Sequence, residues 1–165
     1  MEINYCPKCG NQLRTADISR QTRIRCSSSD CDYVFWNNPT PVVAAIVEVD
    51  NNMIILARNK GWPEKVYGLI TGFLEHGETP GDAVLREVRE ELNLYGTFAS
   101  FIGNYTFFEM NQLIIAYHVI ARGEPIIGDE LADIKLVPVE NLKPWATGTG
   151  PAVRDWLAAR GFSRR

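Results

Sequence analysis

The chain has 165 residues, of which 45% are hydrophobic and 22% are charged, and its formal net charge is −3. This length and apolar content fit one ordinary domain with a small appendage and exclude a largely disordered chain. No apolar run approaches the ~20 residues that cross a bilayer, and no basic segment followed by an apolar one opens the chain. We therefore expect a cytoplasmic protein that does not span a membrane and does not bind duplex DNA by charge alone.

The first 37 residues contain all four cysteines, Cys6, Cys9, Cys26 and Cys31, in a polar segment of near-neutral charge. In a reducing compartment, clustered cysteine pairs more often bind metal than form disulfides. Two residues separate the first pair and four separate the second, which lies within the range for structural zinc. The pattern predicts one Zn²⁺ held by four thiolates, which would stabilise a segment with almost no apolar core.

A turn-rich run, Asn-Asn-Pro-Thr-Pro at 37–41, predicts a boundary between a ribbon at 1–37 and a second domain at 38–165. Beyond it, β-branched and apolar runs bounded by turn residues predict strands. The expected strands are 42–49, 53–57, 98–108, 113–121 and 134–139. A final amphipathic helix is expected at 151–160, so strands and two helices together indicate an α/β or α+β sandwich.

A helix is predicted between Thr79 and Asn93. Thr79 is a typical N-cap, Pro80 suits the first helical position, and Asn93 tolerates the left-handed conformation common just after a helix. Apolar residues of this helix form a stripe that would face the core, namely Val84, Val88 and Leu92.

Three carboxylates, Glu87, Glu90 and Glu91, share one face of the same helix, since they stand at i, i+3 and i+4. Like charges at this spacing destabilise a helix. One interpretation is a solvated charged face, which is common on exposed helices. The other is a site for a hard divalent cation such as Mg²⁺, which prefers carboxylate oxygens.

The residues around this helix follow a fixed pattern: Gly72, five residues, Glu78, seven residues, and then Arg-Glu-Val-Arg-Glu-Glu-Leu-Asn-Leu at 86–94. This pattern resembles the signature of the Nudix hydrolases, G-x5-E-x7-R-E-U-x-E-E-x-G-U, in which U is aliphatic. The chain departs from it at Asn93, where the family has glycine, and asparagine is the next-best residue for a left-handed helix end. The resemblance extends over residues 39 to about 145 and implies an α/β/α sandwich with a mixed β-sheet.

The resemblance also implies the chemistry, which is metal-dependent hydrolysis of a P–O–P bond in a nucleoside diphosphate derivative. Two or three Mg²⁺ or Mn²⁺ ions would be bound by Glu87, Glu90 and Glu91 together with the carbonyl of Gly72. Similar enzymes recruit an acid from outside the signature, and Glu130 is the first candidate here, ahead of Asp129 and Glu109. In the same pattern, Arg86 and Glu78 would support the catalytic residues.

A zinc ribbon before the signature is similar to the NADH pyrophosphatase-like branch of the family, as is the loop Gly-Phe-Leu-Glu-His-Gly-Glu at 72–78. Members specific for NADH carry a Ser-Gln-Pro-Trp-type array after the signature, whereas this chain has Asn-Tyr-Thr-Phe-Phe-Glu-Met at 104–110. The resemblance therefore leaves NADH or NAD, ADP-ribose, FAD and nucleotide sugars open as substrates.

Aromatic side chains could stack on the base of such a nucleotide, because planar rings need an apolar face. The candidates are Phe73, Tyr105 and Phe107, and core packing is the competing interpretation for each of them.

Two other functions stay open. One is a binding module that senses a nucleotide, although such proteins commonly lose the helix carboxylates. The other is removal of 5′ nucleotide caps from RNA, against which the near-neutral charge of the ribbon argues weakly. We expect a small-molecule nucleotide as the substrate. For the ribbon we expect a structural role, such as building a homodimer interface, in preference to substrate binding.

Overall fold

The computed structural model describes residues 3–162 and divides into two compact units, Met1–Asn38 and Pro39–Arg165. We call the first the ribbon unit and the second the sandwich unit. Within residues 3–162, the structure contains no helix that is both long and apolar enough to cross a membrane.

The ribbon unit is a three-stranded antiparallel sheet in the order β1-β2-β3. Its strands are β1 (Leu13–Ile18), β2 (Gln21–Cys26) and β3 (Val34–Phe35). Ser19 and Arg20 join β1 to β2, and both have positive φ angles, 52° and 65°. Two consecutive left-handed residues match the twist of the flanking strands and hold the hairpin in an unbroken register.

The sandwich unit is built on a six-stranded mixed sheet in which β4 is central. β4 pairs with β8 in parallel along one edge. Its other edge pairs first with β6 and then with β5, so two short strands share one side of β4. The strands are β4 (Thr40–Val49), β5 (Met53–Asn59), β6 (Ile70–Phe73), β7 (Tyr95–Phe107), β8 (Gln112–Arg122) and β9 (Leu131–Pro138).

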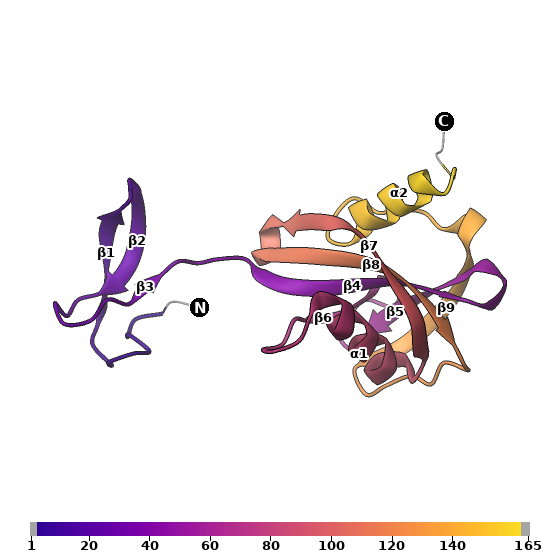
Figure 1. Ribbon diagram of the computed structural model, residues 1–165, viewed down its shortest axis with the longest axis horizontal. Coiled ribbons are helices and arrows are strands. Elements are labelled where there is room, and N and C mark those ends of the chain that lie inside the picture. The colour runs from indigo at the N-terminus through magenta and orange to yellow at the C-terminus, as the bar shows by residue number, and fades with distance from the viewer. Residues whose placement is uncertain (1–2, 163–165) are drawn as a thin grey trace. The chain divides into compact units, whose positions relative to one another are not determined.

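Two helices, α1 (Pro80–Leu92) and α2 (Gly150–Ala159), cover opposite faces of this sheet, as Figure 1 shows. Successive residues of a strand point to opposite faces, and β4 is apolar on both. Val43, Ala45 and Val47 pack in the core that contains α1, whereas Ala44 and Ile46 pack in the core that contains α2. The α/β/α sandwich with a mixed sheet is therefore confirmed.

All five predicted strands of this unit are present, with ends that differ by up to three residues. β6 was not predicted, because four residues including Thr71 and Gly72 carry no periodic apolar pattern. It forms through pairing with the middle of β4, where Gly72 lies opposite Val43. Such a long-range contact leaves no local signal in a sequence.

A partly buried charge cluster links α2 to the sheet. Glu48 Oε2 on β4 lies 2.7 Å from Nε2 of His118 on β8, and it also accepts a hydrogen bond from Arg160, directly after α2. Burial opposes the charged form of Glu48, but hydrogen bonds from Arg160 and His118 outweigh it, and the pKa of Glu48 is lowered. Burial also lowers the pKa of His118 from its ordinary 6.5.

This cluster is expected to make the sandwich unit less stable in acid. Both lowered pKa values mean that the unfolded chain binds more protons, so the stabilisation is complete above about pH 6.5 and declines as the pH falls. Glu48→Gln should lower the free energy of unfolding at neutral pH by about 1–3 kcal/mol. It should also steepen the decline between about pH 7 and 5, because the Glu48 charge raises the pKa of His118 and its removal leaves the effect of burial unopposed. Urea unfolding between about pH 5 and 7 measures both effects. Glu140→Gln, at an exposed position, is the control, and equal stability of the two variants would contradict the prediction.

Candidate active site

Helix α1 begins and ends as its sequence predicts. Thr79 Oγ1 accepts a hydrogen bond from the backbone N–H of Asp82 (3.2 Å), and Pro80 occupies the first turn. Asn93 ends the helix in the left-handed conformation at φ 53°, and its N–H donates to the carbonyl of Arg89 at 2.9 Å. These caps fix the start and the rotation of the helix, and thus the direction of its carboxylates.

The three glutamates of α1 have very different exposures. The side chain of Glu90 is 59% exposed and that of Glu87 is 12% exposed. Glu91 is only 5% exposed and is the single buried charged residue among those described. A uniformly solvated face, the competing interpretation of this helix, is therefore wrong for two of the three side chains.

Arg86 holds the acidic residues together. Its Nε and Nη2 donate to the two carboxylate oxygens of Glu78, at 3.1 and 2.8 Å. Its Nη1 donates to Glu87 Oε1 at 2.7 Å and to Glu90 Oε2 at 3.0 Å. Nη2 also donates to the carbonyl of Phe73 at 3.2 Å, which ties the end of β6 to the helix. One planar guanidinium thus orients three carboxylates and one strand end.

Gly72 leaves the space that the carboxylate of Glu87 fills. A Cβ atom built on Gly72 would lie 1.8 Å from Glu87 Oε1, far inside van der Waals contact. Because Gly72 is fixed by its pairing with β4, a side chain here would force Glu87 away. Glycine is therefore required at position 72 because the Glu87 carboxylate approaches its backbone closely, and not because of a positive φ angle.

Gly72→Ala is expected to displace the Glu87 carboxylate. We expect about 1–3 kcal/mol less stability from overpacking and at least about 100-fold lower activity, because this side chain is a predicted metal ligand. Gly81→Ala is the matched control, since its Cβ would meet only Thr79 Oγ1, at 3.9 Å. That control should be active and about 0.5–1 kcal/mol more stable, because alanine is the better helix former. Equal activity of both variants would contradict the role of Gly72.

Glu91 places a carboxyl oxygen without a hydrogen-bond partner inside the protein. Its Oε2 is buried and has no hydrogen-bond partner among the described residues. Burial is the main reason that the pKa of Glu91 is raised to about 8, and the charges of Glu87, Glu130 and Glu90 raise it further. A buried carboxylate without a donor is costly, and a cation beside Oε2 would remove that cost.

The charge of Glu130 acts on the same site from outside the helix. It contributes to the raised pKa of both Glu87 and Glu91. The preceding loop is anchored on α1, because the N–H of Gly128 donates to the carbonyl of Glu91 at 2.8 Å. A Cβ atom at Gly128 would lie 2.6 Å from the carbonyl oxygen of Glu90. Gly128 was not among the predicted site residues, and its only signal in the sequence is its place just before an acidic pair.

The residues of this region fit a hard divalent cation. Four carboxylates, one of them with an unpartnered buried oxygen, and the carbonyl of Gly72 are oxygen ligands of the kind that Mg²⁺ and Mn²⁺ prefer. The excess of negative charge in one place has no structural benefit of its own.

The predicted aromatic residues lie on the α2 side of the sheet. Strand register places Phe73, Val42, Ile114 and Tyr105 in one row across four strands. Phe73, at the end of the row next to Gly72, is 60% exposed. Tyr105 packs in the α2-side core and donates a hydrogen bond to Asp155 at 3.1 Å. Phe107 also packs in that core, so only Phe73 presents a largely open ring.

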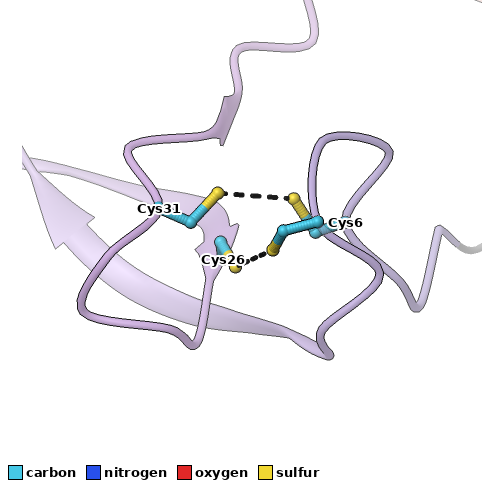
Figure 2. Close-up of side chains that lie close together, drawn as sticks. Cys6, Cys26 and Cys31 are labelled. Carbon is cyan, nitrogen blue, oxygen red and sulfur yellow. Dashed lines mark hydrogen bonds between the residues drawn. The ribbon is translucent and has the colours of Figure 1, made fainter.

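The four cysteines of the ribbon unit form a second cluster, in which Figure 2 shows sulfur atoms converging from separate segments. Their sulfur atoms all lie within 4.8 Å of one another. The distance from Cys6 to Cys31 is 3.7 Å and that from Cys9 to Cys26 is 3.4 Å. A tetrahedral zinc ion with four thiolates requires sulfur atoms about 3.8 Å apart. The cluster therefore fits a structural zinc ion in size and in donor type.

The thiols of this cluster differ in acidity. Hydrogen bonds from the backbone and side chain of Asn11 lower the pKa of Cys9 to about 6. Burial raises the pKa of Cys26 to about 12.

Known proteins resemble this chain in sequence and in fold. The family model of the NUDIX domain matches residues 38–157. A protein named NAD-capped RNA hydrolase NudC from Pseudomonas fluorescens is 27% identical over 145 residues, which cover 87% of this chain and 51% of that protein. One of the same name from Mycobacterium bovis is 33% identical over 85 residues, or 52% and 26% of the two chains. This chain thus spans about half the length, or less, of these curated relatives.

Among solved structures, a NUDIX hydrolase from Nitrosomonas europaea matches with a TM-score of 0.72 at 19% identity, covering 96% of this chain and 94% of that chain. An ADP-ribose pyrophosphatase from Streptococcus suis matches with a TM-score of 0.59 at 16% identity, covering 74% and 92%. At these identities the likeness concerns the fold alone. The family match covers the six-stranded sheet, α1 with its three glutamates and most of α2, and the chain belongs to the Nudix family.

Proposed function

We propose that this protein hydrolyses the P–O–P bond of a nucleoside diphosphate derivative. The observation that carries this proposal is the buried Glu91, whose unpaired Oε2 lies in the field of Glu87, Glu90 and Glu130. A pyrophosphate is itself anionic, so such a site could receive it only with cations present.

Glu87, Glu90, Glu91 and Glu130, with the carbonyl of Gly72, would hold Mg²⁺ or Mn²⁺ ions, two or three in number. When bound, these ions neutralise phosphate oxygens, activate water and stabilise the leaving phosphate. Arg86 orients Glu87 and Glu90 through its Nη1, and Glu78 in turn fixes Arg86. Glu90, the most exposed of the three glutamates of α1, would take the proton of an attacking water.

The substrate class we propose is dinucleotides and related diphosphates: NAD or NADH, ADP-ribose, FAD and nucleotide sugars. The names of the relatives support it, since they include an NAD-capped RNA hydrolase and an ADP-ribose pyrophosphatase. Phe73 follows Gly72 in β6, and its exposed ring, on the α2 side of the sheet, offers a stacking surface for a base or nicotinamide. Tyr105 and Phe107 stay predictions, with packing in the α2-side core as their competing role.

A substrate panel tests the proposal. NADH, NAD, ADP-ribose, FAD, diadenosine polyphosphates and nucleotide sugars are incubated with the protein and either metal, and the products are separated by chromatography. We expect a nucleoside monophosphate and the phosphorylated second moiety from at least one class. No cleavage of any compound with either metal would overturn the proposal. A binding module that senses a nucleotide would instead show ligand-induced thermal stabilisation without products.

We also propose one structural Zn²⁺ per chain in the cysteine cluster. It is supported by the four converging sulfur atoms and by the small apolar core of the ribbon unit, in which, among residues 3–38, Leu13 and Tyr33 are the hydrophobic residues packed on the cysteines. Elemental analysis after dialysis should find one zinc per chain, and a folded ribbon unit without metal would refute this assignment.

A further inference from the structure

The ribbon sheet separates its charged residues by face. In the unbroken register of β1 and β2, Arg14 lies opposite Arg25 and Ala16 lies opposite Arg23. Residues directly opposite each other share a face, and so do alternate residues of one strand. Arg14, Arg23 and Arg25 are therefore on one face of the sheet. We call these three residues, with Trp36, the basic face.

The cysteine cluster lies on the opposite face. Cys26 is adjacent to Arg25 in β2 and so points the other way, and Leu13, opposite Cys26, packs against the cysteines. The basic face is thus not part of the metal site. Asp17 belongs to the cysteine side by the same alternation, and it accepts a hydrogen bond from Thr22 there, at 3.1 Å.

The arginines of the basic face lack acidic partners among residues 3–162. The ion pair of the ribbon unit joins Lys8 to Asp32 and involves none of the three. Arg14 and Arg25 face each other across the strands, and like charges in this position destabilise a sheet. The Nε atom of Arg25 is also buried without a hydrogen-bond partner. Although the total charge of the segment is near neutral, one face of its sheet is therefore positively charged, and an anion bound there would be stabilised.

Trp36 adds an aromatic surface to this charge. Its side chain is 49% exposed. The guanidinium carbon of Arg23 lies 5.7 Å from the centre of the Trp36 ring, and Arg23 Nη1 donates to the Trp36 carbonyl at 2.8 Å. An exposed indole next to arginines combines base stacking with phosphate binding, which is the pairing used by proteins that bind single-stranded nucleic acid.

We propose that the basic face binds single-stranded nucleic acid, with phosphates on Arg14, Arg23 and Arg25 and an unpaired base on Trp36. Charge complementarity selects a polyanion, and the exposed indole selects a strand whose bases are free to stack. This site is separate from the carboxylate cluster, and its existence does not depend on hydrolysis.

Fluorescence anisotropy with the full chain tests the proposal. The probe is a single-stranded oligouridylate of about 12 nucleotides with a free 5′-hydroxyl and a label at its 3′ end, which contains no pyrophosphate to cleave. Binding is measured without Mg²⁺ between about 50 and 200 mM salt. Trp36→Ala should weaken binding roughly 5- to 100-fold with little change in the salt dependence. Arg14→Gln, at an exposed position, should reduce the slope of log K against log salt by about 0.7.

The controls distinguish binding at the basic face from nonspecific attraction to any positive charge on the protein. Lys143→Gln removes one exposed positive charge from the sandwich unit and should bind like the parent protein. Each variant is checked for unchanged zinc content and thermal midpoint, so that a loss of binding cannot come from unfolding. Equal binding by the parent, Trp36→Ala and Arg14→Gln proteins would overturn the proposal. Equal affinity for a duplex or for polyglutamate would also overturn it, because neither offers unpaired bases to the indole.

Discussion

Replacing Glu91 by glutamine is expected to abolish hydrolysis while making the metal-free protein more stable. The buried Oε2 has no partner, and burial together with three neighbouring acids opposes its charge. Glutamine keeps the shape and removes the charge, so we expect about 1 kcal/mol of added stability, or a thermal midpoint higher by roughly 2–4 °C. Activity at saturating Mg²⁺ should fall by at least about 10³-fold, since metal-ion stabilisation of a transition state is worth several kcal/mol.

Two further variants sharpen this experiment. Glu90→Gln should lose activity without the gain in stability, because the Glu90 side chain is 59% exposed. Glu64→Gln changes an exposed carboxylate in a loop and should leave both quantities unchanged. Turnover near the parent level in Glu91→Gln or Glu90→Gln would disprove the assignment of the helix carboxylates. A Glu91→Gln protein that is inactive and less stable would show that the carboxylate has a structural role instead.

Replacing Cys26 by serine is expected to unfold the ribbon unit and leave the sandwich unit folded. Cys26 is completely buried, and its sulfur lies 3.4 Å from that of Cys9. Structural zinc contributes about 10–16 kcal/mol of apparent binding free energy in small zinc domains, and the ribbon has little apolar core to replace it. Zinc per chain should fall from one to near zero, as measured by elemental analysis.

Hydrogen exchange locates the effect of this substitution. Backbone amides of 13–26 should lose protection, whereas those of β4 and α1 should keep it, because the two units are separately compact. Ser27→Ala, at the exposed next residue, is the control and should retain zinc and protection. Unchanged protection of the ribbon in Cys26→Ser would contradict a folding role for the metal.

The sequence by itself determined those features that depend on near neighbours along the chain. The apolar run of β4 and the caps at Thr79 and Asn93 follow from local residue types. The stripe of Val84, Val88 and Leu92 follows from the helical period of 3.6 residues. The same periodicity placed the carboxylates of α1 on one face. Cysteine spacing likewise predicted a cluster that the fold brings together.

Only the tertiary structure decided how residues of the same chemical type differ in burial and in contacts. Glu90 and Glu91 are adjacent in the sequence, yet one is exposed and the other is buried, because the loop that contains Gly128 packs on α1. The pairing of β6 with β4 placed Gly72 against Glu87. In the ribbon, strand register turned a segment of near-neutral charge into a sheet with its arginines on one face. Burial and register arise from contacts between distant segments, so composition and local pattern do not contain them.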